Sequence, residues 1–141
     1  MISNSLIFGN AFDGRVHVDF TKIPSAGTKF VGPLQLLAEL EQKVGMASLD
    51  IDNYVRVEEW KKAIESAKPT IFTASYDKDK NGVAKQLLRW RDALVMAGWN
   101  KNNAIKHPIL DGLKKIEEHF TCDGVADRWV RMLDYCTNNI L

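Results

Sequence analysis

The chain has 141 residues, enough for one ordinary domain with a real hydrophobic core. Its composition, 45% hydrophobic and 26% charged, is that of a globular protein and gives no indication of disorder. A net charge of +1 provides no overall field for nucleic acid or an anionic membrane, so a nucleic-acid contact would need a local patch. Cys122 and Cys136 have neither zinc-binding nor redox spacing. Because no secretory signal or membrane-spanning run is visible, we expect a soluble cytoplasmic protein.

The first predicted element is a β-hairpin. Residues 5–9 form a short apolar run, and residues 15–20 alternate strictly between apolar and polar side chains. Strict alternation is typical of a half-buried strand, and an Asp-Gly pair in the connection is typical of a hairpin turn. Residues 21–32 contain Pro24, Gly27 and Gly32 and are expected to form a loop.

The rest of the chain is predicted to be mainly helical. Pro33 and Gly45 mark the start and end of the first helix, because proline favours the first helical position and glycine ends helices. A further strand is expected over residues 70–76. The expected helices are residues 33–45, 52–67, 82–97, 108–120 and 124–137. The sequence therefore predicts a predominantly helical α+β domain over residues 1–141, with about five helices and a small sheet.

Arg91 is the most informative residue of the helix expected over residues 82–97. On a wheel of about 100° per residue, it falls in the middle of the sector filled by apolar side chains such as Leu87 and Leu94. A guanidinium cannot lose its charge, and burying it unpaired costs roughly several kcal/mol. It therefore needs a carboxylate, several carbonyls or an anionic ligand. Asp92 projects about 100° away and is expected to be poorly placed as the partner.

Two interpretations of Arg91 remain open. In the first, Arg91 forms a buried ion pair with an acid from another element, with Asp13 and Asp77 as candidate partners, or its stem reaches past the core edge. In the second, Arg91 binds an anionic substrate together with one of these aspartates. No nucleophile, base or metal cluster with a recognisable spacing accompanies it. We therefore assign no catalytic residue, metal or cofactor.

Gly9 and Gly14 have the G-x-x-x-x-G spacing of a phosphate-binding loop. Arg15 stands where the lysine of such a loop belongs, and Val16 stands where a hydroxyl should bind magnesium. Asp13 also adds a negative charge to a loop that would hold an anion. We interpret the segment as a hairpin, with a degenerate nucleotide loop as the alternative.

Asp77 to Gly82 resembles the first half of a calcium-binding loop, with oxygen-bearing side chains at positions one, three and five. Leu88 occupies position twelve, which must supply a bidentate glutamate. Asp79 or Asn81 as a helix N-cap explains the same residues. We expect no calcium site here.

Several short segments form a recognisable series along the chain. The main ones are Leu6-Ile-Phe-Gly9, Phe12-Asp-Gly-Arg15, Val31-Gly-Pro-Leu34, Leu87-Leu-Arg-Trp-Arg-Asp92 and Ala97-Gly-Trp99. Together the segments resemble the N-terminal portion of large bacterial exonucleases of the PD-(D/E)XK (RecB/AddB-like) class. Those proteins combine a helicase-like body with a nuclease domain near the C-terminus. The nuclease motif has no counterpart here, so no nuclease residue is carried over.

The resemblance implies a non-catalytic N-terminal module of a DNA end-processing protein in repair or recombination. Its partners would be single-stranded DNA or the remainder of a helicase–nuclease polypeptide. Arg91 and Arg89 would contact phosphates, Trp99 would stack on a base, and Arg15 is a further anion-binding candidate. The alternative is a stand-alone interaction or scaffold domain with an Arg91-centred pocket for an acidic partner.

Overall fold

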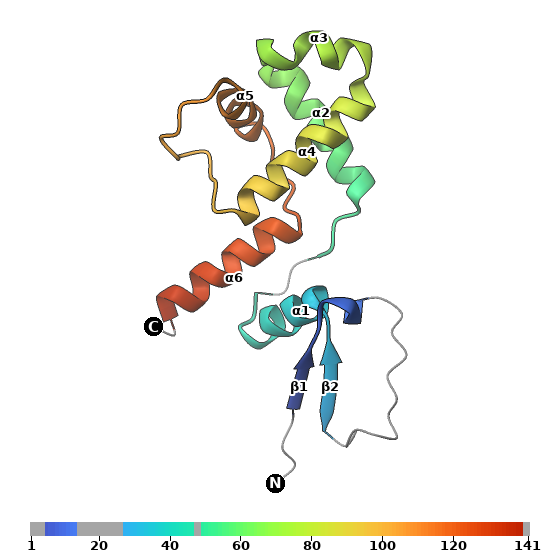
Figure 1. The fold of residues 1–141 in the computed structure, drawn as a ribbon, viewed down its shortest axis with the longest axis vertical. Coiled ribbons are helices and arrows are strands. Elements are labelled where there is room, and N and C mark those ends of the chain that lie inside the picture. The colour runs from blue at the N-terminus through green and yellow to red at the C-terminus, as the bar shows by residue number, and fades with distance from the viewer. Residues whose placement is uncertain (1–4, 14–26, 47–48, 140–141) are drawn as a thin grey trace. The chain divides into compact units, whose positions relative to one another are not determined.

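A computed structural model describes residues 5–13, 27–46 and 49–139. These ranges contain a two-stranded sheet, one short 3-10 helix and six α-helices (Figure 1). The mostly helical α+β class is confirmed, with six α-helices where about five were expected. One domain was expected, and the chain divides into two compact units, Met1–Ser48 and Leu49–Leu141. We call these the N-terminal unit and the C-terminal unit.

The N-terminal unit contains a parallel sheet, so the predicted hairpin is wrong. Strand β1, Ser5–Phe8, pairs in parallel with β2, Thr28–Val31, with Ser5 opposite Thr28 and Phe8 opposite Val31. Strand β2 lies in the segment expected to be a loop. The chain enters the 3-10 helix η1, Asn10–Asp13, after β1, and parallel strands need a crossover instead of a tight turn. The strand predicted over residues 15–20 lies outside the described residues.

Helix α1, Pro33–Lys43, begins at the predicted proline. The Asp13 carboxylate accepts hydrogen bonds from the backbone N–H groups of Leu34 at 2.7 Å and Gln35 at 3.2 Å. A Cβ at Gly32 would lie 2.3 Å from Asp13 Oδ1, so this close approach requires glycine. The helix N-terminus that would hold a phosphate is therefore occupied by the chain's own carboxylate.

The C-terminal unit is entirely helical within residues 49–139. Its central helix α4 packs on α2, α3 and α6, whereas α5 packs on α2 and α3 (Figure 1). The helices are α2 (Asn53–Ala67), α3 (Thr70–Lys78), α4 (Lys80–Met96), α5 (Pro108–Glu117) and α6 (Val125–Asn139). Four of these five were predicted from the spacing of their apolar residues.

The core of the C-terminal unit lies where α2, α4 and α5 face one another. The predicted stripes supply Trp60, Leu87, Leu113 and Ile116, which are all buried. Helical spacing puts Trp90 at the edge of the apolar sector of α4, and 44% of this residue is exposed.

Helix α3 replaces the strand predicted over residues 70–76. Its threonine, isoleucine and aromatic residues are also common in strands, and for this reason the residue types of this segment predicted a strand. Phe72 and Tyr76 are buried four residues apart, a spacing that places both on one face of a helix. The Tyr76 hydroxyl donates to the Glu65 carboxylate at 3.3 Å, which ties this face to α2.

Candidate functional site

Arg91 is buried, with 4% of the residue exposed. Glu117 at the end of α5 accepts hydrogen bonds from Nε at 2.9 Å and from Nη2 at 2.6 Å. Asp127 in the first turn of α6 accepts from Nη1 at 2.7 Å and from Nη2 at 2.6 Å. Asp92 accepts a further bond from Nη1 at 3.1 Å. Each of the five guanidinium N–H groups therefore has a carboxylate partner, and the buried ion pair is confirmed.

Asp92 was expected to be poorly placed as a partner of Arg91, and this expectation is wrong. Its carboxylate also accepts two hydrogen bonds from Arg56 of α2, at 2.8 and 2.9 Å. Arg56 is buried, and its Nη2 lies 4.0 Å from the Asp127 carboxylate. Asp92 therefore bridges two guanidinium groups, because α2 brings Arg56 to its other side. We call Arg56, Arg91, Asp92, Glu117 and Asp127 the arginine–carboxylate cluster.

Phe120 and Gly124 shape the space around the cluster. The Phe120 ring centre lies 5.5 Å from Cζ of Arg91 and 5.9 Å from Cζ of Arg56, within cation–π range. A Cβ at Gly124 would lie 2.4 Å from Arg56 Cζ, so a side chain at this position would displace the guanidinium. The Gly124 N–H donates to Asp127 at 2.7 Å and thereby fixes this carboxylate at the start of α6.

The charges of Arg91 and Asp127 stabilise each other. Burial opposes the charge of Arg91, but hydrogen bonds to Glu117 and Asp127 outweigh it and raise the pKa of Arg91. Burial likewise opposes the charge of Asp127, but the bonds from Arg91 and the Gly124 N–H lower the pKa of Asp127. Both groups are charged at neutral pH, so neither is poised to transfer a proton there.

A pocket of about 410 Å³ lies against the cluster in the C-terminal unit. Arg91, Trp99, Glu117 and Asp127 form part of its wall. The charged lining residues are the acids Glu117, Asp123, Asp127 and Asp134 and the bases Arg91, Lys101 and Arg131. Because the acids are in excess and Arg91 has no unused N–H group, this wall is unsuited to an anion.

The other predicted site residues do not gather around Arg91. Asp13 caps α1, and Asp77 lies beside another pocket, so the expected partners are replaced by Glu117, Asp127 and Asp92. Arg89 is exposed on α4, where no ion pair holds it within the described residues. Trp99 is only 9% exposed and packs in the core, so little of its ring is accessible to a base. Arg15 lies outside the described residues.

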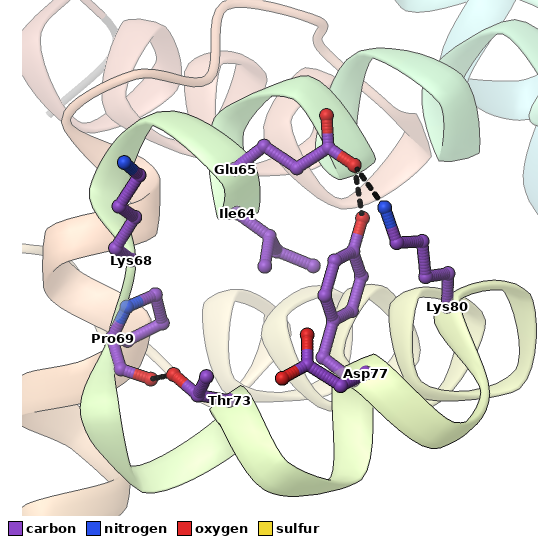
Figure 2. A pocket seen from close by; sticks show the side chains of 8 residues that line it. Ile64, Glu65, Lys68, Pro69, Thr73, Asp77 and Lys80 are labelled. Atoms are coloured by element: carbon purple, nitrogen blue, oxygen red, sulfur yellow. Dashed lines mark hydrogen bonds and ion pairs between the residues drawn. The ribbon is translucent and has the colours of Figure 1, made fainter.

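A second pocket of about 360 Å³ lies between the end of α2 and helix α3, with Lys80 of α4 also in its lining (Figure 2). Glu65 accepts from the Tyr76 hydroxyl and from Lys80 Nζ at 3.1 Å. Burial and the charge of Glu65 raise the pKa of Tyr76 to about 12, so the phenol stays neutral. Two lysines and two carboxylates line the pocket, which gives it no preference for a charged ligand. No feature of the sequence indicated this pocket.

The sequence did contain a signal for the missed members of the cluster. Arg56 lies four residues before Trp60 on the apolar stripe of α2, and Glu117 lies four residues after Leu113 on that of α5. A charge on an apolar stripe is the same observation that singled out Arg91. Applied to every helix, it would also have found Arg128 of α6, which is buried and paired with Asp50.

No family model, curated protein or solved structure matches this chain. Within the described ranges, no helix is long and apolar enough to cross a membrane. The same residues contain no group of three or more His, Cys, Asp or Glu side chains that could hold a metal ion. Cys122 and Cys136 are both free thiols.

Proposed function

We propose that this chain is a non-catalytic N-terminal module of a DNA end-processing exonuclease of the PD-(D/E)XK (RecB/AddB-like) class. The observation that carries the proposal is the position of two segments of the resemblance, Leu87-Leu-Arg-Trp-Arg-Asp92 and Ala97-Gly-Trp99. Leu87, Leu88 and Arg91 of one segment are buried in α4, and Asp92 joins the cluster. Trp99 of the other segment lies in the core. The residues on which the resemblance rests in these two segments are thus ones that help to build the C-terminal unit.

The exposed face of α4 is the DNA contact we propose. Lys85 and Arg89 lie one turn apart on this face, and both are exposed. They can contact successive phosphates of a single strand without breaking an ion pair of the described residues. Arg91 is left out of the contact because its N–H groups are fully used, and Trp99 is left out because its ring is buried.

Fluorescence anisotropy with a labelled oligothymidine at low ionic strength tests this contact. We expect Arg89→Glu to weaken binding about tenfold or more, and to reduce the slope of log K against log salt by about 0.7 for each lost phosphate contact. Lys62→Glu makes a matched charge change on α2, where Lys62 is exposed, and is expected to leave binding within about twofold. Binding that is absent, or equally affected by both variants, would refute the contact.

The module itself is tested separately by the reading frame beyond the codon for Leu141. We expect hundreds of further codons with a nuclease signature toward the far end. A stop codon directly after Leu141 would contradict the proposal and would favour an interaction or scaffold domain. In that alternative, Arg91 offers no free N–H group to an acidic partner, so the docking surface has to lie elsewhere.

A further inference from the structure

An apolar groove of about 570 Å³ opens between α4 and α5. Its lining consists of Trp90, Ala93, Leu94, His107, Ile109, Leu110 and Leu113. Trp90 is 44% exposed, and Leu94, Ile109 and Leu110 are half-buried. Large apolar side chains that stay accessible in one concave place mark interaction sites more often than scattered surface residues do.

The packing of α5 explains why the groove is open. Helix α5 rests on α2 and α3, and the loop over residues 97–107 carries the chain to it from the end of α4 (Figure 1). The Arg91–Glu117 hydrogen bonds join α4 to the end of α5, and the groove lies along other residues of the same two helices. Leu113 closes the floor of the groove, and Trp90 stands at its open side.

The chemistry of the lining favours a protein segment as the occupant. Only two lining side chains carry hydrogen-bonding groups: the indole N–H of Trp90 and the imidazole of His107, whose Nδ1 accepts from the backbone N–H of Ile109 at 3.3 Å. A nucleotide or polar metabolite would bury its polar groups here with few partners, which is unfavourable. The aliphatic floor suits the apolar face of a helix, which inserts side chains at positions i, i+3, i+4 and i+7.

The charges beside the groove indicate an acidic occupant. Arg89 lies four residues before Ala93 and Lys114 lies four residues after Leu110, so each shares a helix face with a lining residue. Lys106 directly precedes the lining residue His107, and all three basic residues are exposed. Asp111, next to Leu110, is an exposed acid of the same stretch. Three positive charges against one negative charge attract acidic residues and repel basic ones at the groove edge.

We propose that this groove binds an amphipathic helix of a partner protein. Leucine, phenylalanine or similar side chains on one face of that helix fill the groove, and flanking aspartates or glutamates face Lys106 and Lys114. Trp90 is the expected anchor, because exposed tryptophans at the centre of an interface often dominate its affinity. This inference goes beyond the proposed function and does not depend on it.

A peptide-display library of random 16-residue segments, selected on the whole chain, tests the groove. We expect enriched peptides to carry apolar residues at helical spacing and a net negative charge. Anisotropy of the labelled peptides should show that Trp90→Glu weakens binding tenfold or more. Leu133→Glu is the matched control, because Leu133 is 61% exposed on α6, away from the groove, and should change affinity less than twofold. Lys106→Glu combined with Lys114→Glu should weaken binding and flatten its salt dependence.

Four results would overturn the inference. One is enrichment of basic or uncharged peptides, and another is peptide binding that Trp90→Glu leaves unchanged. A third is a dimer in sedimentation velocity that Trp90→Glu dissociates, since a second copy would then fill the groove. The last is oligothymidine binding that depends on Trp90 and the two lysines, which would make the occupant a nucleic acid. That result would leave the proposed DNA role standing, so the two proposals fail separately.

Discussion

At the scale of single residues, Arg91 connects three helices of the C-terminal unit. Its partners come from α4 itself, from the end of α5 and from the first turn of α6. Pairing of this kind adds little stability over a well-packed apolar core, but removing one partner leaves buried charges uncompensated. The role of Arg91 is therefore to hold the helices in one arrangement.

We expect Arg91→Ala to lower the free energy of unfolding by about 3–5 kcal/mol, because Glu117 and Asp127 would lose their main counter-charge. Arg91→Lys should lower the free energy of unfolding by less than Arg91→Ala does. The lysine ammonium restores the positive charge, but it lacks the planar guanidinium that bonds two carboxylates side by side. Urea unfolding followed by circular dichroism measures both. Arg89→Ala, on the exposed face of the same helix, should stay within about 0.5 kcal/mol. A loss below about 1 kcal/mol for Arg91→Ala would show that the cluster does not hold the fold.

The sequence could predict that Arg91 needs a buried acid, but not which one. Its position among apolar residues follows from helical spacing alone. The identity of the acid depends on how α5 and α6 pack against α4, and no local pattern encodes that packing. Asp13 and Asp77 have the residue type that a partner of Arg91 needs, whereas only the packing of α5 brings Glu117 to Arg91.

At the scale of elements, helix ends were more predictable than strand pairing. Pro33 and Asp79 act through their own backbone and side-chain chemistry within a few residues. The partner of β1 is more than twenty residues away, and a parallel pairing gives no turn signal. Helix α3 was also difficult to predict, because its residue types are common in strands. Only the burial of Phe72 and Tyr76 in the core, on one face of a helix, distinguishes the two structures.

Asp79 is the N-cap of α4, and its carboxylate accepts from the Gly82 N–H at 2.8 Å. We expect Asp79→Ala to lower the free energy of unfolding by about 1 kcal/mol, because an N–H group of the first turn loses its acceptor. Thermal or urea unfolding measures the change. Asp77→Ala removes an exposed aspartate two residues earlier, outside the cap, and should cost less than about 0.5 kcal/mol. Equal losses for the two variants would argue against the cap.

At the scale of the whole molecule, the mostly helical class and most helix positions followed from the sequence. The division into two units did not, because no Pro-, Gly- or Ser-rich run in the sequence marks the boundary between them. The pairing of the two strands and the pairing of charges within the cluster could not be predicted either, since both join segments that are distant along the chain. The spacing of apolar residues along the chain predicts single helices and strands. How these elements pack together depends on contacts between distant residues, which a single sequence does not reveal.

Acid should destabilise the folded protein through Asp127. Its pKa in the folded state lies below the ordinary value of 3.8, so the charged form stabilises the fold above about pH 4. That stabilisation is lost as the pH falls through the folded-state pKa. We expect the difference in unfolding free energy between wild type and Asp127→Asn to be largest near neutral pH and to shrink below about pH 4. Urea unfolding across the pH series measures it, and a difference independent of pH would contradict the assignment.

The saturation of Arg91 also constrains how this protein can change over generations. Replacing Arg91 alone leaves three carboxylates with Arg56 as their one counter-charge in the cluster, so a single substitution there is costly. Evolutionary change in the cluster therefore requires several substitutions together, in which the charged residues are replaced by apolar residues of similar volume. Lineages descended from a common ancestor should therefore inherit Arg91, Glu117 and Asp127 together or lose them together.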